Sequence, residues 1–142
     1  MAMEGVIMIK LITGKKGTGK TKILIDQINE AVKSTNGNIV CIEKGDNIRR
    51  SISFRVRWCD SESFAIDNYD AFYGFVAGML AGNFDIKDVF VDGILRMGGR
   101  DYDALGNLFE KLDKLTGDEA NVIFTVSADN DELPESVTRF IK

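Results

Sequence analysis

The sequence predicts an α/β domain with three layers, in which helices cover both faces of a mainly parallel sheet. Two observations support this fold class. Short apolar segments alternate along the chain with segments of helical periodicity, and this alternation is typical of parallel sheets with right-handed crossover connections. The chain has 142 residues, a length that suits one compact domain, so we assign residues 1–142 to a single domain.

Four apolar segments are the predicted main strands, because continuous apolar runs of this length indicate strands that are buried on both faces. They cover residues 6–12, 38–43, 89–92 and 122–126. A further segment, residues 51–58, alternates apolar side chains with serine and arginine. This alternation indicates a strand with one buried and one solvated face, so we expect it at a sheet edge or antiparallel to its neighbours.

Helical periodicity predicts the connections between the strands. Capping residues mark where the helices begin and end, with Asp101 as an expected N-cap and Gly117 as an expected stop. A glycine-rich segment, residues 93–99, is expected to form a loop. The predicted helices cover residues 21–36, 67–82 and 101–117, with a short last helix that has Pro134 in its first turn.

The composition limits the classes of function. No apolar segment reaches the roughly 18 residues that a membrane helix needs, so we expect no membrane association. A formal net charge of −4 argues against a protein that binds nucleic acid through its overall charge. A local basic patch would still permit nucleic-acid binding. The chain has no histidine, and Cys41 and Cys59 are too few for a zinc site, so we expect buried thiols in a cytoplasmic protein.

One segment carries most of the functional information. It matches the pattern G-x-x-x-x-G-K-[ST] at every fixed position and reads Gly14-Lys15-Lys16-Gly17-Thr18-Gly19-Lys20-Thr21. Glycines let backbone N–H groups approach phosphate oxygens, Lys20 supplies a positive charge, and the Thr21 hydroxyl suits Mg²⁺. The segment therefore predicts a nucleoside triphosphate site. No guanine-reading motif such as N-K-x-D is present, so we expect ATP with Mg²⁺ as its cofactor.

A second segment, Val89-Phe90-Val91-Asp92, ends an apolar strand with an acid. Together the two segments resemble the P-loop NTPase superfamily, most closely a minimal RecA-like (additional-strand) ATPase core, and the order of elements agrees over nearly the whole chain. The resemblance implies that Lys20 stabilises the transferred phosphoryl group and that Asp92 is the Walker B residue, which holds Mg²⁺ with Thr21. For the four main strands, numbered along the chain, we expect the sheet order 2-3-4-1.

The position after Asp92 departs from many ATPases of the additional-strand class, since Gly93 stands where they have a water-polarising glutamate. Glu43 ends the second predicted strand, where RecA-like ATPases have their catalytic glutamate, and we expect it to orient water. The alternative is a solvated acid at a strand end. Thr125 and Ser127, at the end of the fourth strand, are candidates for sensing the γ-phosphate.

The leading expectation is an ATP-binding protein with weak Mg²⁺-dependent ATPase activity. A small-molecule kinase is the alternative enzyme, because thymidine kinases share this order of motifs, although the cysteines of their zinc-binding segment are missing here. A nucleotide-controlled interaction module, with a homo-oligomer as one form, is the third reading. Six arginines are candidates for binding an acidic substrate or a nucleic-acid backbone, or for acting as an arginine finger; the alternative is a solvated surface position. They are Arg49, Arg50, Arg55, Arg57, Arg96 and Arg100.

Overall fold

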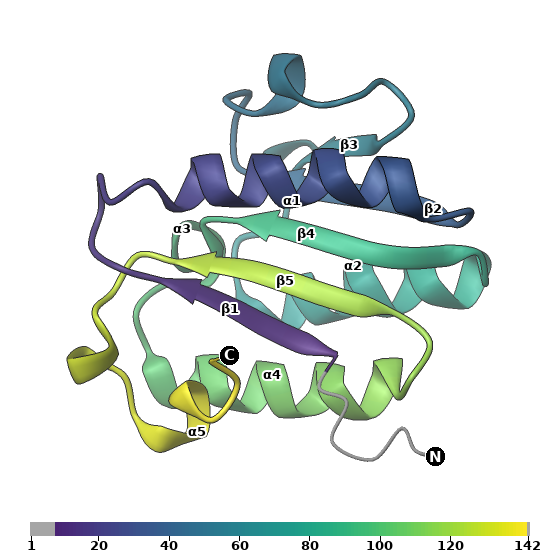
Figure 1. Cartoon of the computed structure of the whole chain (residues 1–142). Helices are drawn as coiled ribbons and strands as arrows, with labels where there is room; N and C mark the ends of the chain where they lie inside the picture. The colour runs from purple at the N-terminus through teal and green to yellow at the C-terminus, as the bar shows by residue number, and fades with distance from the viewer. Residues whose placement is uncertain (1–7, 142) are drawn as a thin grey trace.

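The computed structural model describes residues 8–141 and contains one five-stranded sheet (Figure 1). All neighbouring strands pair in parallel, in the order β1-β5-β4-β2-β3. The apolar segments form the sheet interior, as continuous apolar runs do when both faces are covered. The strands are β1 (Ile9–Thr13), β2 (Asn38–Glu43), β3 (Arg57–Asp60), β4 (Ile86–Asp92) and β5 (Asn121–Val126).

Helices cover both faces of the sheet (Figure 1). One buried cluster, which includes Leu24, Ile28 and Phe90, joins α1 to the sheet, and a larger one, which includes Phe72, Phe109 and Phe124, joins α2 and α4 to the opposite face. This confirms the α/β class and is consistent with three layers. The helices are α1 (Lys20–Ser34), α2 (Tyr69–Gly82), α3 (Ile94–Gly98), α4 (Tyr102–Thr116) and α5 (Glu135–Thr138).

The predicted number and order of strands need correction. The sheet has five parallel strands. The order 2-3-4-1, which corresponds to β2-β4-β5-β1, holds for the four main strands but is incomplete, because β3 extends the sheet beyond β2. Residues 51–58 do not form the predicted strand: a short 3-10 turn, Arg49–Ser51, leads into loop, and only Arg57–Asp60 pair, parallel to β2. Residues 6 and 7 of the first predicted strand lie outside the described residues.

Two predicted caps of α4 are confirmed. The loop predicted for residues 93–99, between β4 and α4, is not. Asp101 caps α4 by accepting a hydrogen bond from Ala104 N at 3.1 Å, and Gly117 ends that helix. The helix predicted from residue 67 begins at Tyr69, with Asn68 as its N-cap. Residues 94–98 form the short helix α3, because buried Ile94 there packs into the core despite the surrounding glycines.

Parallel pairing brings the carboxyl ends of the strands to one edge of the sheet. The last residues of β1 and β5, Thr13 and Val126, are partners, and Glu43 at the end of β2 pairs with Asp92 at the end of β4. Ligands of open parallel sheets bind at this edge. Of the helices described, none combines the length and the apolar character that a membrane crossing requires.

Candidate phosphate-binding site

Residues 14–19 connect the end of β1 to the start of α1 in a loop that depends on glycine. Gly14, Gly17 and Gly19 have φ angles of 146°, 85° and 89°, which residues with a side chain rarely adopt. A Cβ at Gly14 would also lie 2.7 Å from Thr18 Oγ1. Thr18 Oγ1 in turn donates to Lys15 O at 2.7 Å. The fixed glycines of the sequence motif are thus required by the loop's conformation and, at Gly14, by its internal packing.

The loop and the first turn of α1 present backbone donors that the rest of the fold leaves free. Within residues 8–141, no hydrogen bond uses the backbone N–H of Gly17, Gly19, Lys20 or Thr21 as its donor. Gly19 is the N-cap of α1 and provides no side-chain acceptor. The amino end of a 15-residue helix also carries a partial positive charge. Phosphate oxygens are the acceptors that suit such a set of donors.

Lys20 is the first residue of α1 and is largely buried at 7% exposure. Its ammonium group donates to Lys15 O at 2.8 Å and so lies against the loop. Burial lowers the pKa of Lys20, while the nearby Asp92 carboxylate raises it in part. None of the salt bridges within residues 8–141 involves this ammonium, so an added anion would stabilise it.

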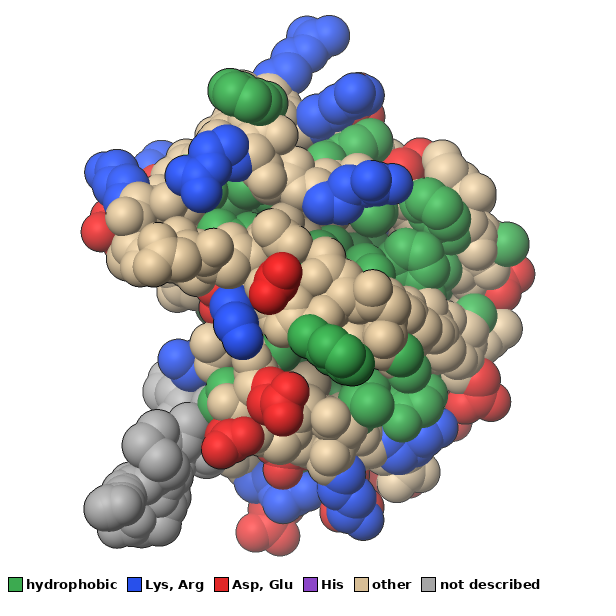
Figure 2. Space-filling model, turned by 90° about the vertical axis from the view of Figure 1, so that its right-hand side faces the viewer, with side chains coloured by type: hydrophobic (Ala, Val, Ile, Leu, Met, Phe, Trp, Pro, Cys, Tyr) green, Lys and Arg blue, Asp and Glu red, His purple; other side chains and the backbone are tan. Residues whose placement is uncertain are grey.

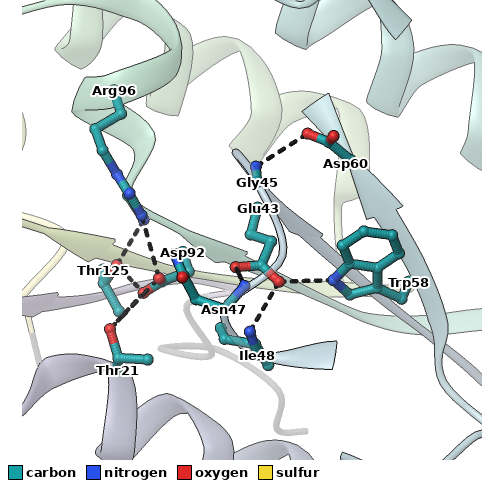
Figure 3. A network of polar contacts seen from close by, with 11 residues as sticks. Thr21, Glu43, Gly45, Asn47, Ile48, Trp58, Asp60, Asp92, Arg96 and Thr125 are labelled. Carbon is teal, nitrogen blue, oxygen red and sulfur yellow. Dashed lines mark hydrogen bonds and ion pairs between the residues drawn. The ribbon is translucent and has the colours of Figure 1, made fainter. Parts of the chain in front are cut away.

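Asp92, at the end of β4, is buried at 3% exposure and is fixed by hydroxyl groups from two other elements (Figure 3). Its Oδ1 accepts from Thr125 Oγ1 at 2.8 Å and from Thr21 Oγ1 at 3.2 Å. Thr125 Oγ1 also accepts from Gly93 N at 2.7 Å. The fold therefore brings Thr21 and Asp92, both expected to hold Mg²⁺, into direct contact, and it uses the Thr125 hydroxyl to position the carboxylate.

Gly93, which follows Asp92, has a conformation and surroundings that disfavour a side chain. Gly93 has a φ of 77°, and a Cβ there would lie 2.6 Å from Arg96 Nε. Arg96 Nη2 is 3.5 Å from Asp92 Oδ2 (Figure 3). A side chain at position 93 would strain the backbone and displace the guanidinium. The Arg96 guanidinium thus lies beside position 93, which the sequence alone did not indicate.

These groups surround one pocket of about 590 Å³ at the carboxyl edge of the sheet. Asp92 is the one carboxylate among the described residues that line it, and Arg100 and Asn47 complete its rim. No sequence pattern had singled out Asn47. The predicted site residues that line the pocket are Lys16, Gly17, Gly19, Lys20, Thr21 and Asp92, with Thr125, Ser127, Arg96 and Arg100 from the wider set of candidates.

Glu43 lies beside this pocket but does not line it. Its side chain is fully buried, at 0% exposure, so it is not a solvated acid. One carboxylate oxygen accepts from Asn47 N at 3.0 Å, and the other accepts from Ile48 N at 2.9 Å and Trp58 Nε1 at 2.7 Å (Figure 3). With three donors satisfied, Glu43 fixes the loop after β2 to β3. In this geometry both carboxylate oxygens face donors of the protein.

The pocket's chemistry suits a polyanion with a divalent cation. Among residues 8–141, no group of three or more His, Cys, Asp or Glu side chains is arranged to hold a metal. Mg²⁺, however, is usually held by one or two protein oxygens together with substrate phosphates and water. Thr21 and Asp92 supply that minimal set of oxygens. The residues present thus fit a metal that arrives with its phosphate ligand.

Comparison of the sequence with models of known protein families and with curated proteins finds no match. Function must therefore be inferred from the geometry of the site. The four arginines from 49 to 57, which are candidates for binding an acidic substrate, do not line this pocket.

Proposed function

We propose that this protein binds a nucleoside triphosphate, with ATP favoured, together with Mg²⁺ in the pocket at the carboxyl edge of the sheet, and that it hydrolyses the nucleotide slowly. The observation that carries the proposal is the set of free backbone N–H groups at Gly17, Gly19, Lys20 and Thr21. They lie at the start of α1 in a loop whose sequence matches the phosphate-binding pattern at every fixed position. This combination of donors, sequence and helix end is what a P-loop NTPase requires.

The proposal gives each polar group a role. The loop N–H groups and Lys20 hold the β- and γ-phosphates, and Thr21 and Asp92 are the protein oxygens for Mg²⁺, which when bound neutralises phosphate charge. Thr125 keeps the Asp92 carboxylate oriented, as its 2.8 Å hydrogen bond indicates. Arg96, half-exposed beside Gly93, provides a further positive charge toward the pocket. We assign it to stabilising charge on the γ-phosphate.

Slow rather than efficient turnover is proposed because the pocket offers no base for the attacking water. Asp92 is the one acid among the described lining residues, and two hydroxyl groups already engage it. Glu43, the residue expected to orient water, is held by three donors outside the lining. A positioned general base typically contributes about 10²- to 10⁴-fold in rate. Its absence favours, as a second candidate, a nucleotide-controlled interaction module with negligible turnover.

A thermal-shift measurement tests nucleotide binding. At a hundredfold excess over Kd, a ligand that binds the native state adds about 2.7 kcal/mol of stability, which corresponds to a rise in Tm of about 5–10 °C for a domain of this size. We expect such a rise with millimolar Mg-ATP. Lys20→Ala should abolish it, because the variant lacks the ammonium group between the loop and the phosphates.

Lys22→Ala is the matched control. Lys22 is two residues further along α1, is exposed and pairs with Asp26 at 2.9 Å, so its removal should leave the shift intact. The proposal fails if wild-type protein shows no shift, or if both lysine variants respond to Mg-ATP alike. Release of inorganic phosphate then separates the two candidates: slow, Mg²⁺-dependent release that Lys20→Ala abolishes supports the ATPase, and binding without release supports the interaction module.

A further inference from the structure

The segment from residue 47 to residue 59, which includes the start of β3, carries a local positive charge on an acidic protein. Its four arginines, Arg49, Arg50, Arg55 and Arg57, are all exposed, and no Asp or Glu occurs from residue 47 to 59. None of the salt bridges within residues 8–141 involves any of them. With a net charge of −4 for the whole chain, this is a marked reversal of sign. Four unneutralised guanidinium groups in one short segment favour a polyanionic partner.

Aromatic side chains lie among these arginines. Phe54 is 98% exposed, the most exposed large apolar side chain of the described residues. Trp58 is partly buried, and the Arg49 guanidinium lies 4.8 Å from its ring centroid. Phe54, Trp58 and three of the arginines, Arg49, Arg55 and Arg57, line a surface hollow of about 430 Å³. We call Arg49, Arg50, Phe54, Arg55, Arg57 and Trp58 the arginine–aromatic surface.

The backbone beneath the arginine–aromatic surface is well anchored. Val56 N donates to Ser53 O at 3.1 Å, which makes a tight turn with Phe54 at its tip. Buried Val56 and Ile48 pack into the cluster under α1. Figure 2 shows Lys and Arg side chains with hydrophobic side chains between them at the top of the molecule, the end where this segment projects in Figure 1. The exposed phenylalanine is therefore held in place rather than carried on a loose chain end.

We propose that the arginine–aromatic surface binds single-stranded nucleic acid, with the arginines on phosphates and Phe54 stacked on a base. Single strands expose both groups at once, and proteins that bind them combine a positive groove with aromatic platforms. A duplex keeps its bases stacked and offers Phe54 no partner. An acidic peptide would satisfy the arginines but would give no reason to expose an aromatic ring. The surface is separate from the lining of the phosphate pocket, so this inference does not depend on the proposed nucleotide site.

Fluorescence anisotropy of a labelled single-stranded oligonucleotide of about 12 nucleotides, a length within the range of single-strand site sizes, tests the inference on the full chain at low salt. Phe54→Ala should weaken binding by about 5- to 150-fold, the range for loss of one base-stacking contact. Its side chain is almost wholly exposed, so the fold should not be affected. Phe84→Ala, at another exposed phenylalanine (80%), is the matched control and should bind as wild type does.

Salt dependence tests the arginines separately. Arg50→Ala should reduce the slope of log affinity against log salt by about 0.7, the amount for one phosphate contact on a single strand. Arg139→Ala, which removes an arginine paired with Glu110 at 3.3 Å, should leave the slope unchanged. The inference is overturned if no anisotropy change occurs, if Phe54→Ala and Phe84→Ala bind alike, or if a duplex of the same sequence binds as tightly. Competition by polyglutamate as strong as that by unlabelled oligonucleotide would also overturn it and would indicate an acidic protein partner.

Discussion

Replacing Glu43 by glutamine distinguishes a structural carboxylate from a catalytic one. In the native protein three N–H donors, at 2.7–3.0 Å, face its two oxygens. A glutamine keeps one oxygen, which can serve Ile48 and Trp58, but its NH₂ group then faces the N–H of Asn47. One bond is lost, worth about 2 kcal/mol, and two change from charge-assisted to neutral, at about 1 kcal/mol each. Relief from burying a carboxylate offsets part of this sum, so we expect a net loss of about 2 kcal/mol.

Urea denaturation followed by far-UV circular dichroism measures this loss as a lower midpoint at unchanged slope. Glu30→Gln, at an exposed position on α1, is the control and should leave the midpoint in place. Phosphate release per folded molecule should persist in Glu43→Gln. The reasoning is refuted if Glu43→Gln has wild-type stability while its phosphate release falls about 100-fold or more, since that pattern belongs to a residue that activates water.

Three further predictions concern the site and the core. Gly93→Ala should lower the unfolding free energy by about 1–2 kcal/mol, because alanine is strained at a φ of 77° and its Cβ would displace Arg96. An unchanged midpoint in a denaturant titration would contradict this. Thr125→Val should cost about 1–3 kcal/mol, since it leaves the buried N–H of Gly93 without its acceptor, and a Tm equal to wild type would contradict it. Burial raises the pKa values of Cys41 and Tyr69 in the native state. The unfolded state therefore loses these protons first as pH rises, and the free energy of unfolding should fall above about pH 8.5. Urea titrations that give the same unfolding free energy from pH 8 to 11 would contradict this.

The phosphate loop was predictable because its geometry is encoded locally. Positive φ angles at Gly14 and Gly19 and a helix that begins at Lys20 follow from residues adjacent in the chain. Asp92 could be identified from the sequence because it is an acid at the end of an apolar strand. The contact of Asp92 with Thr21, 71 residues away, follows once the parallel strands are aligned at one edge. Binding of the nucleotide itself stays a prediction.

The errors arose where tertiary contacts decide the structure. The alternating pattern of residues 51–58 is real, but Val56 is buried under α1 while Phe54 faces solvent, so the pattern comes from packing of a loop and not from a sheet. Glu43 has its partners in Trp58 and in the loop after β2. Neither the β2–β3 pairing nor the guanidinium over Gly93 has a local signal. The surroundings of Glu43 and Arg96 therefore could not be predicted from the sequence.

The most direct test of the central claim is a crystal structure of the protein with a non-hydrolysable ATP analogue and Mg²⁺. We predict β- and γ-phosphate oxygens within about 3 Å of the backbone nitrogens of Gly17, Gly19, Lys20 and Thr21. Mg²⁺ should lie about 2.0–2.1 Å from Thr21 Oγ1, with Asp92 beside it. A nucleotide bound elsewhere with residues 14–21 unoccupied, or no bound nucleotide at millimolar concentration, would contradict the claim.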